Sequence, residues 1–226
     1  MNRESAARGW QRVMSACVLT AVLSVGTATA CDVAPVIRYA EPAAVKAFFE
    51  RQGKRVVTFV GYSGAGYENR PAMLDEAGRM LDRWSPTDTI VNIGATPDGI
   101  GAVYDLAKQR GFTTAGIVST QAKRYAAEIS PCVDYVFYVE DDSWGGFVDG
   151  DTTLSPTSTA MVDASDVMVA IGGGAVARDE LIAAKRAHKT VHFIAADMHH
   201  AKAIEKAQKK GLDEPTDFSG AAASAF

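Results

Sequence analysis

The sequence predicts an α/β fold, with a single Rossmann-like domain in which helices cover both faces of a parallel β-sheet. Three observations lead to this prediction. Short apolar runs rich in β-branched residues alternate along the chain with longer amphipathic runs. The turns between the two kinds of run are rich in glycine. Strands that alternate with helices pair in parallel, because each helix carries the chain back across the sheet.

The elements follow one another in a regular order. The expected strands are residues 55–60, 89–93, 114–118, 135–139, 167–171 and 190–195. The expected helices are residues 43–51, 71–84, 102–110, 122–129, 176–188 and 201–210. Pro42 suits a first helical turn, and Gly111 and Gly211 suit helix C-caps. The chain then divides into a signal segment (1–30), a linker with a short helix (31–54), the Rossmann-like domain (55–211) and a tail (212–226), which is expected to be largely unstructured apart from packing at Phe218.

The first 30 residues are expected to be a signal peptide. Three arginines precede an apolar run, and Ala28-Thr29-Ala30 places small residues at positions −3 and −1 of a cleavage site. Cys31 follows directly, as in bacterial lipoproteins, so lipidation of Cys31 and anchoring at the cell envelope are the main expectation. Ordinary export to the periplasm, an uncleaved anchor and a cytoplasmic protein with a misassigned start codon are the alternatives.

Composition narrows the classes of partner. The net charge is −4 and the basic residues are scattered, whereas a dedicated nucleic-acid binder shows a basic face. No run after residue 30 is long and apolar enough to span a bilayer, so contact with a membrane is expected only through a lipid on Cys31. Three cysteines do not make a disulfide scaffold. Cys132 is expected to be a buried thiol, or the disulfide partner of Cys31 if Cys31 is not lipidated.

Polar residues and glycines gather where the expected strands end. The carboxyl ends of parallel strands meet at one edge of a sheet, and ligands bind there. Gly172-Gly173-Gly174 ends a strand and opens a helix, which lets the backbone approach a phosphate and aims free N–H groups at it. The alternative is a tight turn whose glycines serve packing. The expected ligand-binding residues are Gly61, Ser63, Gly64, Gly94, Thr96, Asp98, Gly99, Ser119, Thr120, Gly172, Gly173 and Gly174.

Two residues at the start of the helix after Gly174 are the catalytic candidates. Arg178 is suited to gripping an anion. Glu180 is either a helix-start acid or an acid–base group at a ribose or an attacking water. Asp179, between them, is expected to be a solvated charge.

Residues 140–158 form the longest expected irregular stretch, and a loop of this length is usually functional or mobile. In it, Trp144 is either a lid over a base or a buried loop anchor. A cation at Asp149–Asp151 and zinc at Asp197–His200 both lack a full set of ligands, so no metal and no cofactor is expected.

Three segments resemble the loops of the SLOG superfamily, which contains the LOG ("lysine decarboxylase-like") phosphoribohydrolases. They are residues 60–64, 94–103 and 161–174, and the likeness extends over most of residues 55–197. The third segment resembles the one that ends in the family's Pro-Gly-Gly-x-Gly-Thr-x-x-Glu signature. Glu180 keeps the glutamate, while Gly172 replaces the proline and Val176-Ala177 the Gly-Thr pair. Thr157 stands where LOG enzymes carry the arginine of their proposed catalytic pair.

The resemblance implies a small nucleotide-like ligand and a homodimer. Loss of the arginine and of the Gly-Thr pair favours a binding module, a sensor or a carrier. Retention of Glu180 favours the alternative, a hydrolase that cleaves the N-glycosidic bond of a nucleoside monophosphate. A Rossmann-like interaction protein at the envelope, in which the loops are relics, is a third hypothesis.

Overall fold

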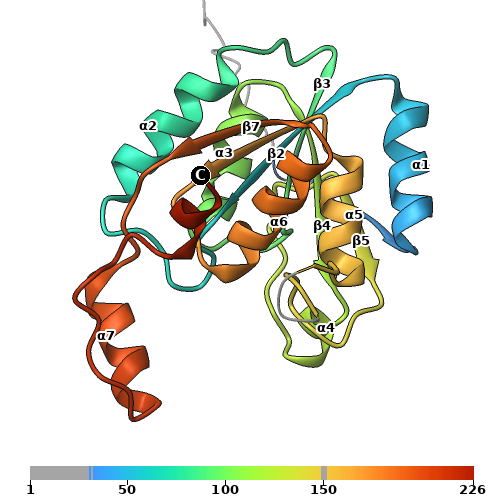
Figure 1. Ribbon diagram of the computed structural model, residues 1–226. Coiled ribbons are helices and arrows are strands. Elements are labelled where there is room, and N and C mark those ends of the chain that lie inside the picture. Colours follow the sequence, from blue (N-terminus) through green and yellow to red (C-terminus); the bar gives the residue numbers. More distant parts are fainter. Residues whose placement is uncertain (1–30, 32, 149–151) are drawn as a thin grey trace, which may run out of the picture.

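The computed structural model describes residues 31, 33–148 and 152–226, so the expected signal peptide and Asp149–Asp151 lie outside the described residues. In this part of the chain, seven strands form one parallel sheet with the order β1-β5-β4-β3-β2-β6-β7 (Figure 1). Helices cover both of its faces, which confirms the predicted α/β class. From β2 the chain builds outward through β3, β4 and β5, and then returns to place β6 on the other side of β2. The β2–β6 neighbours therefore form the switch point of the sheet.

The strands agree closely with the predicted runs, and one strand is additional. They are β1 (Val36–Tyr39), β2 (Arg55–Gly61), β3 (Thr89–Ile93), β4 (Thr113–Ser119), β5 (Tyr135–Val139), β6 (Val167–Ile171) and β7 (Thr190–Ile194). The helices are α1 (Pro42–Gln52), α2 (Arg70–Leu81), η1 (Gly99–Ala102), α3 (Val103–Gln109), α4 (Gln121–Arg124), α5 (Pro156–Ala164), α6 (Ala175–Arg186), α7 (His200–Lys209) and η2 (Ala221–Ala225). The labels η1 and η2 denote short 3₁₀ helices.

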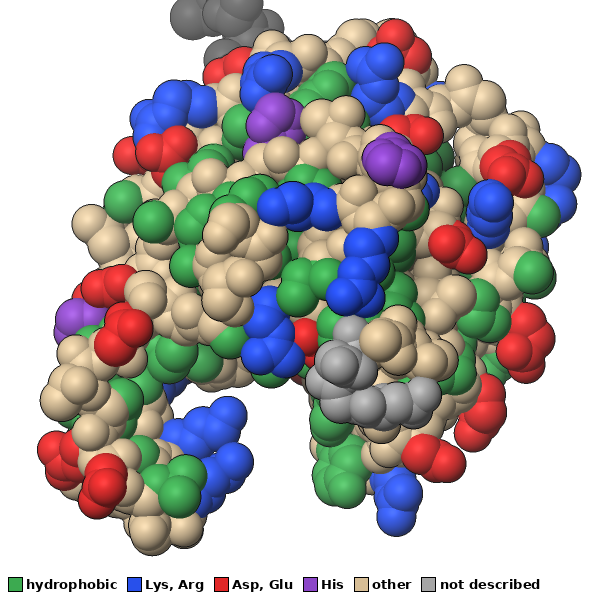
Figure 2. Space-filling model, in the orientation of Figure 1, with side chains coloured by type: hydrophobic (Ala, Val, Ile, Leu, Met, Phe, Trp, Pro, Cys, Tyr) green, Lys and Arg blue, Asp and Glu red, His purple; other side chains and the backbone are tan. Residues whose placement is uncertain are grey.

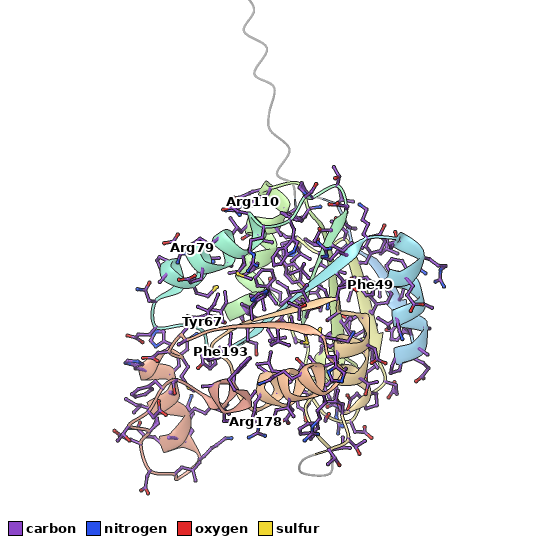
Figure 3. All side chains as sticks on the ribbon, turned by 45° about the horizontal axis from the view of Figure 1, so that its top comes forward. Phe49, Tyr67, Arg79, Arg110, Arg178 and Phe193 are labelled. Carbon is purple, nitrogen blue, oxygen red and sulfur yellow. A yellow bond between two sulfur atoms is a disulfide. The ribbon has the colours of Figure 1, made fainter. Side chains whose placement is uncertain are left out.

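The sheet separates two hydrophobic cores. On one face, α2 and α3 pack against the strands, with Met73, Leu81 and Tyr104 fully or almost fully buried. On the other face, α1, α5 and α6 pack against the strands, and Phe49 of α1, labelled in Figure 3, lies in this second core. Consecutive residues of the central strands therefore alternate between two dry layers, which explains why those runs are apolar throughout.

Besides the short 3₁₀ helices η1 and η2, strand β1 and helix α5 were not predicted. Strand β1 is an edge strand whose four residues are all exposed, so its sequence lacks the alternation of buried and exposed residues that would predict a strand. Its pairing with β5 is a purely tertiary contact. Helix α5 begins within the stretch that was expected to be irregular up to residue 158. Ser155-Pro156 is an N-cap followed by proline at N1, a helix-start signal that was present in the sequence. Conversely, the expected helix at 122–129 is only the single turn α4.

The tail is ordered, contrary to the prediction. It returns to the body and ends in η2, which packs on α6. Ala222 is fully buried, and its N–H donates to the carbonyl of Gly173. The Tyr62 hydroxyl donates to the Ser219 carbonyl 2.6 Å away. These contacts join residues about 50 to 160 positions apart in sequence, and no local pattern encodes them.

Helix α7 stands apart from this compact body. None of its residues is buried, and the space-filling view shows an open notch between it and the rest of the molecule (Figure 2). Nowhere in residues 33–148 and 152–226 does a helix combine the length and the apolar character needed to cross a bilayer.

Cys31 and Cys132 are joined by a disulfide. The preferred expectation, a free buried thiol at Cys132, is therefore wrong, and the alternative holds. The bridge occupies the Cys31 sulfur atom, which a thioether-linked lipid would also require. Within the described ranges, the one group of three side chains that could ligate a metal is Cys31, Asp105 and Cys132, which contains this bridge.

Candidate functional site

A cavity of about 240 Å³ lies at the carboxyl edge of the sheet, where β2, β3 and β4 end. Helices α5 and α6 close one side of it, and the loop after β5 closes another. Its wall is mainly apolar and includes Phe59, Ile93, Ile117 and Met161. An apolar cavity with a few polar groups, at the carboxyl edge of a parallel sheet, is the usual form of a small-molecule site.

Six of the 14 predicted site residues line this cavity. Gly61 and Ser63 come from the loop after β2, Gly94 and Thr96 from the loop after β3, and Ser119 from the end of β4. Glu180 enters from the second turn of α6. The predicted convergence of separate loops at one edge therefore exists, although it involves fewer residues than expected. Gly64, Asp98, Gly99, Thr120, Gly172, Gly173, Gly174 and Arg178 do not line the cavity.

The glycines of the Gly172–Gly174 turn pack against protein. Gly172 has φ +55°, and a Cβ there would lie 2.6 Å from both the Ala196 carbonyl oxygen and the Tyr62 ring. A Cβ on Gly173 would lie 2.7 Å from Ala177 Cβ and 3.2 Å from Ala222 Cβ. Both glycines thus have the packing role that was the alternative expectation for this turn. Gly174, the N-cap of α6, has open space around it.

Gly94 differs from these packed glycines. A Cβ built on it meets no atom within 4 Å, and its φ lies outside the left-handed region. Gly94 also lines the cavity. Gly99, in contrast, has φ +57°, and a Cβ there would collide with the Tyr62 carbonyl oxygen. A glycine is therefore required at this position because the backbone packs against the loop after β2, and not because a ligand approaches it.

Arg178 is held away from the cavity. Its guanidinium forms an ion pair with Asp179, with Nε 2.8 Å and a terminal nitrogen 2.7 Å from the same carboxylate oxygen. It lies on the side of α6 that faces away from the sheet (Figure 3). Asp179 itself is buried, and its second oxygen accepts a hydrogen bond from the N–H of Phe147. The expectation that Asp179 is a solvated charge is therefore wrong, because this residue fastens the loop after β5 to α6.

Glu180 is the one ionisable group among the described residues that line the cavity. Its side chain is almost fully buried, at 4 % exposure. One oxygen, Oε1, accepts a hydrogen bond of 2.6 Å from the Ser158 hydroxyl. Burial raises the pKa of Glu180 to about 7, an effect that the Ser158 hydrogen bond reduces and the nearby charge of Asp179 increases. A carboxyl group that titrates near neutrality can donate or accept a proton, or read a ligand in either state.

The loop after β5 is fixed in place by Asp141. Its carboxylate accepts hydrogen bonds from the N–H groups of Ser143 and Thr157, each 2.8–2.9 Å long. Burial alone would raise the pKa of Asp141, but these hydrogen bonds outweigh burial and lower it. The Asp141 carbonyl accepts from Ser119 and Thr120, so these two predicted ligand residues support the loop.

Three further residues complete the site. Ser158 orients the carboxyl group of Glu180. The sequence did not point to Ser158, because helix α5, which carries it, was not predicted. Thr157 lines the cavity, and its buried hydroxyl makes no hydrogen bond of good geometry within the described structure. Trp144 lines the mouth and is 50 % exposed, so it is not a buried anchor. Its indole lies 5.9 Å from the ring of Tyr125, between centroids.

Comparisons with known proteins give no family for the chain. No protein-family model matches it, and no curated protein matches it. Among solved structures, a molybdenum cofactor carrier protein from Chlamydomonas reinhardtii aligns with 62 % of this chain and 76 % of its own, at 24 % identity and a TM-score of 0.45. A second structure described as the Moco carrier protein of that organism aligns with 76 % of this chain and 94 % of its own, at 21 % identity and a TM-score of 0.43.

A structural-genomics protein, TM1055, aligns with 61 % of this chain and 72 % of its own, at 24 % identity and a TM-score of 0.43. At these identities and scores, neither a ligand nor an activity carries over from the three structures. The function of this chain therefore has to be inferred from the geometry of the site itself.

Proposed function

We propose that this chain binds a nucleotide, or a nucleotide-derived phosphorylated molecule, in the cavity at the carboxyl edge of the sheet, as a sensor or a carrier. One observation carries the proposal: Gly61, Ser63, Gly94, Thr96 and the start of α6 meet around a single cavity. Backbone N–H groups and hydroxyls of such loops hold phosphate, while the apolar wall suits a base.

The charges around the cavity favour reversible binding. No lysine or arginine lines it within the described residues, and Arg178 is paired with Asp179. A phosphate held by N–H groups and hydroxyls alone lacks the charge-assisted hydrogen bonds that make arginine clamps strong. Such a site suits a protein that takes up and releases its ligand.

Gly94→Val tests this proposal. The substitution adds a branched side chain at a residue that lines the cavity, and its Cβ would meet no atom within 4 Å, so the fold should persist. In the unchanged protein, a saturating nucleoside monophosphate should raise the melting temperature by about 5 °C or more. In Gly94→Val the rise should disappear, while the melting temperature without ligand changes little.

Gly64→Val is the matched control. Gly64 also has open space and lies in the loop after β2, but it does not line the cavity, so the rise should persist. Differential scanning fluorimetry across a panel of nucleoside mono- and diphosphates is the measurement. Failure of the whole panel to stabilise the unchanged protein would refute the proposal.

Hydrolysis of an N-glycosidic bond is the second candidate, and the Glu180 carboxyl group favours it. Glu180 lines the cavity, and its pKa of about 7 suits an acid–base catalyst. The missing arginine is not replaced by Arg178, which is turned away. Release of free base from a nucleoside monophosphate, measured by chromatography, should fall at least about 100-fold in Glu180→Gln if this carboxyl group is the catalyst. Release that is unchanged in Glu180→Gln would remove it from the mechanism.

Membership of the SLOG superfamily, export and a homodimer are also part of this proposal. The Cys31–Cys132 bridge supports export, because disulfides persist in oxidising compartments such as the periplasm. The same bridge supports ordinary export over a lipid anchor.

A further inference from the structure

We infer that the ligand carries a nitrogen heterocycle, which stacks on Trp144 and presents its hydrogen-bonding edge to Glu180. This inference rests on the proposed function, because it names the part of the nucleotide that Trp144 and Glu180 recognise. It assigns Glu180 a role in reading the ligand, which differs from the catalytic role considered above.

The Glu180 carboxyl group is held in one orientation. Ser158 Oγ accepts a hydrogen bond of 2.8 Å from the N–H of Gly146 and donates its own proton to Glu180 Oε1. That arrangement fixes the carboxyl plane from two elements, α5 and the loop after β5. The second carboxyl oxygen, Oε2, has no partner among the described residues, and Glu180 lines the cavity. One oxygen is therefore committed to the protein, and the other is left for a ligand.

Trp144 is held near the same carboxyl group. Its neighbour Gly145 packs so closely on α5 and α6 that a Cβ there would lie 2.8 Å from Ser158 Oγ and 3.8 Å from Glu180 Oε1. The indole lines the cavity mouth, and Tyr125, 64 % exposed, supports it from outside at an interplanar angle of 32°. An aromatic face and a buried carboxyl group thus belong to one small space.

This combination selects a flat ring with N–H groups. Aromatic side chains stack on any nucleobase. The apolar part of the wall includes Ile117, Val118, Val176 and Ala177, and the hydroxyls come only from Ser63, Thr96, Ser119 and Thr157, so a flat ring matches the wall better than a sugar with hydroxyls on every side. With Oε1 held by Ser158, the free Oε2 of a protonated carboxyl group is a donor, as the acceptor nitrogen N1 of adenine requires. In the ionised state Oε2 is an acceptor, as the N1–H of guanine requires.

The charges around Glu180 place this change of state near neutral pH. From α6, Asp179 adds a negative charge, and Arg178 is paired with it. From the loop after β5, Asp141 keeps its own negative charge, because N–H groups bind it. From α5 only the hydroxyls of Ser158 and Thr157 face the site. With burial as the main cause, the Glu180 pKa is about 7, so pH 6 and pH 8 populate different states.

The test compares adenosine 5′-monophosphate, guanosine 5′-monophosphate and ribose 5-phosphate by calorimetric titration of the full chain at pH 6 and pH 8. For a group of pKa about 7, the competent state changes about tenfold in population between these pH values. Adenosine monophosphate should bind about tenfold more weakly at pH 8, and guanosine monophosphate about tenfold more tightly. The ratio of the two dissociation constants should therefore change about 100-fold. The phosphate, which also titrates near pH 6, is common to all three probes and cancels in the ratio.

Glu180→Gln separates recognition from mere packing. Glutamine has the shape of the protonated acid and offers a donor and an acceptor at every pH. In the variant the ratio of the two dissociation constants should therefore stay the same from pH 6 to pH 8, and the preference for guanosine monophosphate at pH 8 should be lost. Trp144→Ala should weaken both nucleotides about tenfold and leave ribose 5-phosphate unchanged. Glu205→Gln, an exposed glutamate on α7, is the matched control and should behave as the unchanged protein.

The outcomes also distinguish the two proposals. If both nucleotides and ribose 5-phosphate bind in a Gly94-dependent way, but the ratio stays constant from pH 6 to pH 8, the heterocycle inference is overturned and the proposed function stands. If none of the probes binds, the proposed function fails, and the inference fails with it. A ratio that changes equally in Glu180→Gln would also overturn the inference, because the titrating group would then be another one.

Discussion

The adjacent acidic residues Asp179 and Glu180 of α6 are both buried but have entirely different roles. Asp179 is ion-paired with Arg178 and accepts the Phe147 N–H, whereas Glu180 lines the cavity and accepts only the Ser158 hydroxyl. The difference arises because the two side chains leave the helix about 100° apart. One reaches the loop after β5, and the other reaches the cavity at the sheet edge.

The environment of Glu180 predicts a pH-dependent stability. The folded-state pKa of Glu180, about 7, is above the unfolded value of 4.5, so folding favours the protonated carboxyl group. The contribution of Glu180 to the free energy of unfolding is therefore fully present below pH 4.5 and is lost as the pH rises through 7. The loss amounts to at most about 3 kcal/mol. Glu180→Gln should therefore be more stable than the unchanged protein at pH 8, and the advantage should vanish near pH 5. Urea unfolding at pH 5, 6, 7 and 8 measures this difference.

Because each comparison is made at one pH, contributions from other titrating groups cancel between the two proteins. Asp141 has a lowered pKa, so its contribution has the opposite sign and is lost only in acid. An equal stability difference at all four pH values would contradict the raised pKa of Glu180.

At the scale of elements, the glycine turns share one sequence pattern but have two different roles, close packing within the protein and lining of the cavity. Gly172, Gly173 and Gly99 allow backbone to pack against backbone, side chain or the tail. Gly94 leaves space that belongs to the cavity. A glycine-rich turn after a strand therefore predicts close approach, but the identity of what approaches is decided by the neighbouring elements.

Gly172→Ala and Gly94→Ala should separate these two roles. At Gly172 the φ of +55° costs an alanine about 1–2 kcal/mol, and contact with the Ala196 carbonyl and the Tyr62 ring adds to that. The free energy of unfolding should therefore fall by about 2 kcal/mol or more in Gly172→Ala. Gly94→Ala should change it by less than about 0.5 kcal/mol. Chemical denaturation of both variants provides the measurement, and equal effects would show that the Gly172 turn is not strained.

At the scale of the whole molecule, long-range connections hold both ends of the described chain on the body. The tail binds at Gly173 and Tyr62, and the Cys31–Cys132 bridge closes a loop with a sequence separation of 101. A cross-link over such a distance stabilises mainly by restricting the unfolded chain.

Reduction should thus destabilise the protein measurably. Loss of the bridge is expected to lower the free energy of unfolding by about 2–4 kcal/mol and the melting temperature by roughly 5–15 °C. Calorimetry with and without a phosphine reductant gives the size of the effect. The double variant Cys31→Ser/Cys132→Ser should melt at the lower temperature and ignore the reductant. Intact mass spectrometry of the mature protein, showing a lipid on Cys31, would contradict the bridge.

The order of elements and the edge of the sheet that carries the site could be read from the sequence, because both depend on local physics. Short apolar runs that alternate with amphipathic helices predict a parallel sheet covered on both faces. The glycines after β2 and β3 predict a close approach of the backbone at the carboxyl edge of that sheet. Glu180 could be singled out as an acid near the start of the helix after Gly174 and as the glutamate kept from the LOG signature.

Features that no local pattern contained were decided by tertiary structure. Strand β1 exists through its pairing with β5, and the tail is ordered through contacts with Tyr62 and Gly173. The same holds within the site: burial beside Ser158 raises the pKa of Glu180, and pairing with Asp179 turns Arg178 away. The sequence by itself determined which residues follow the strands and can therefore reach the carboxyl edge, because hydrophobic periodicity and turn residues act over only a few positions. Only the folded chain decided which of them share a space, because burial and charge depend on neighbours that are distant in sequence.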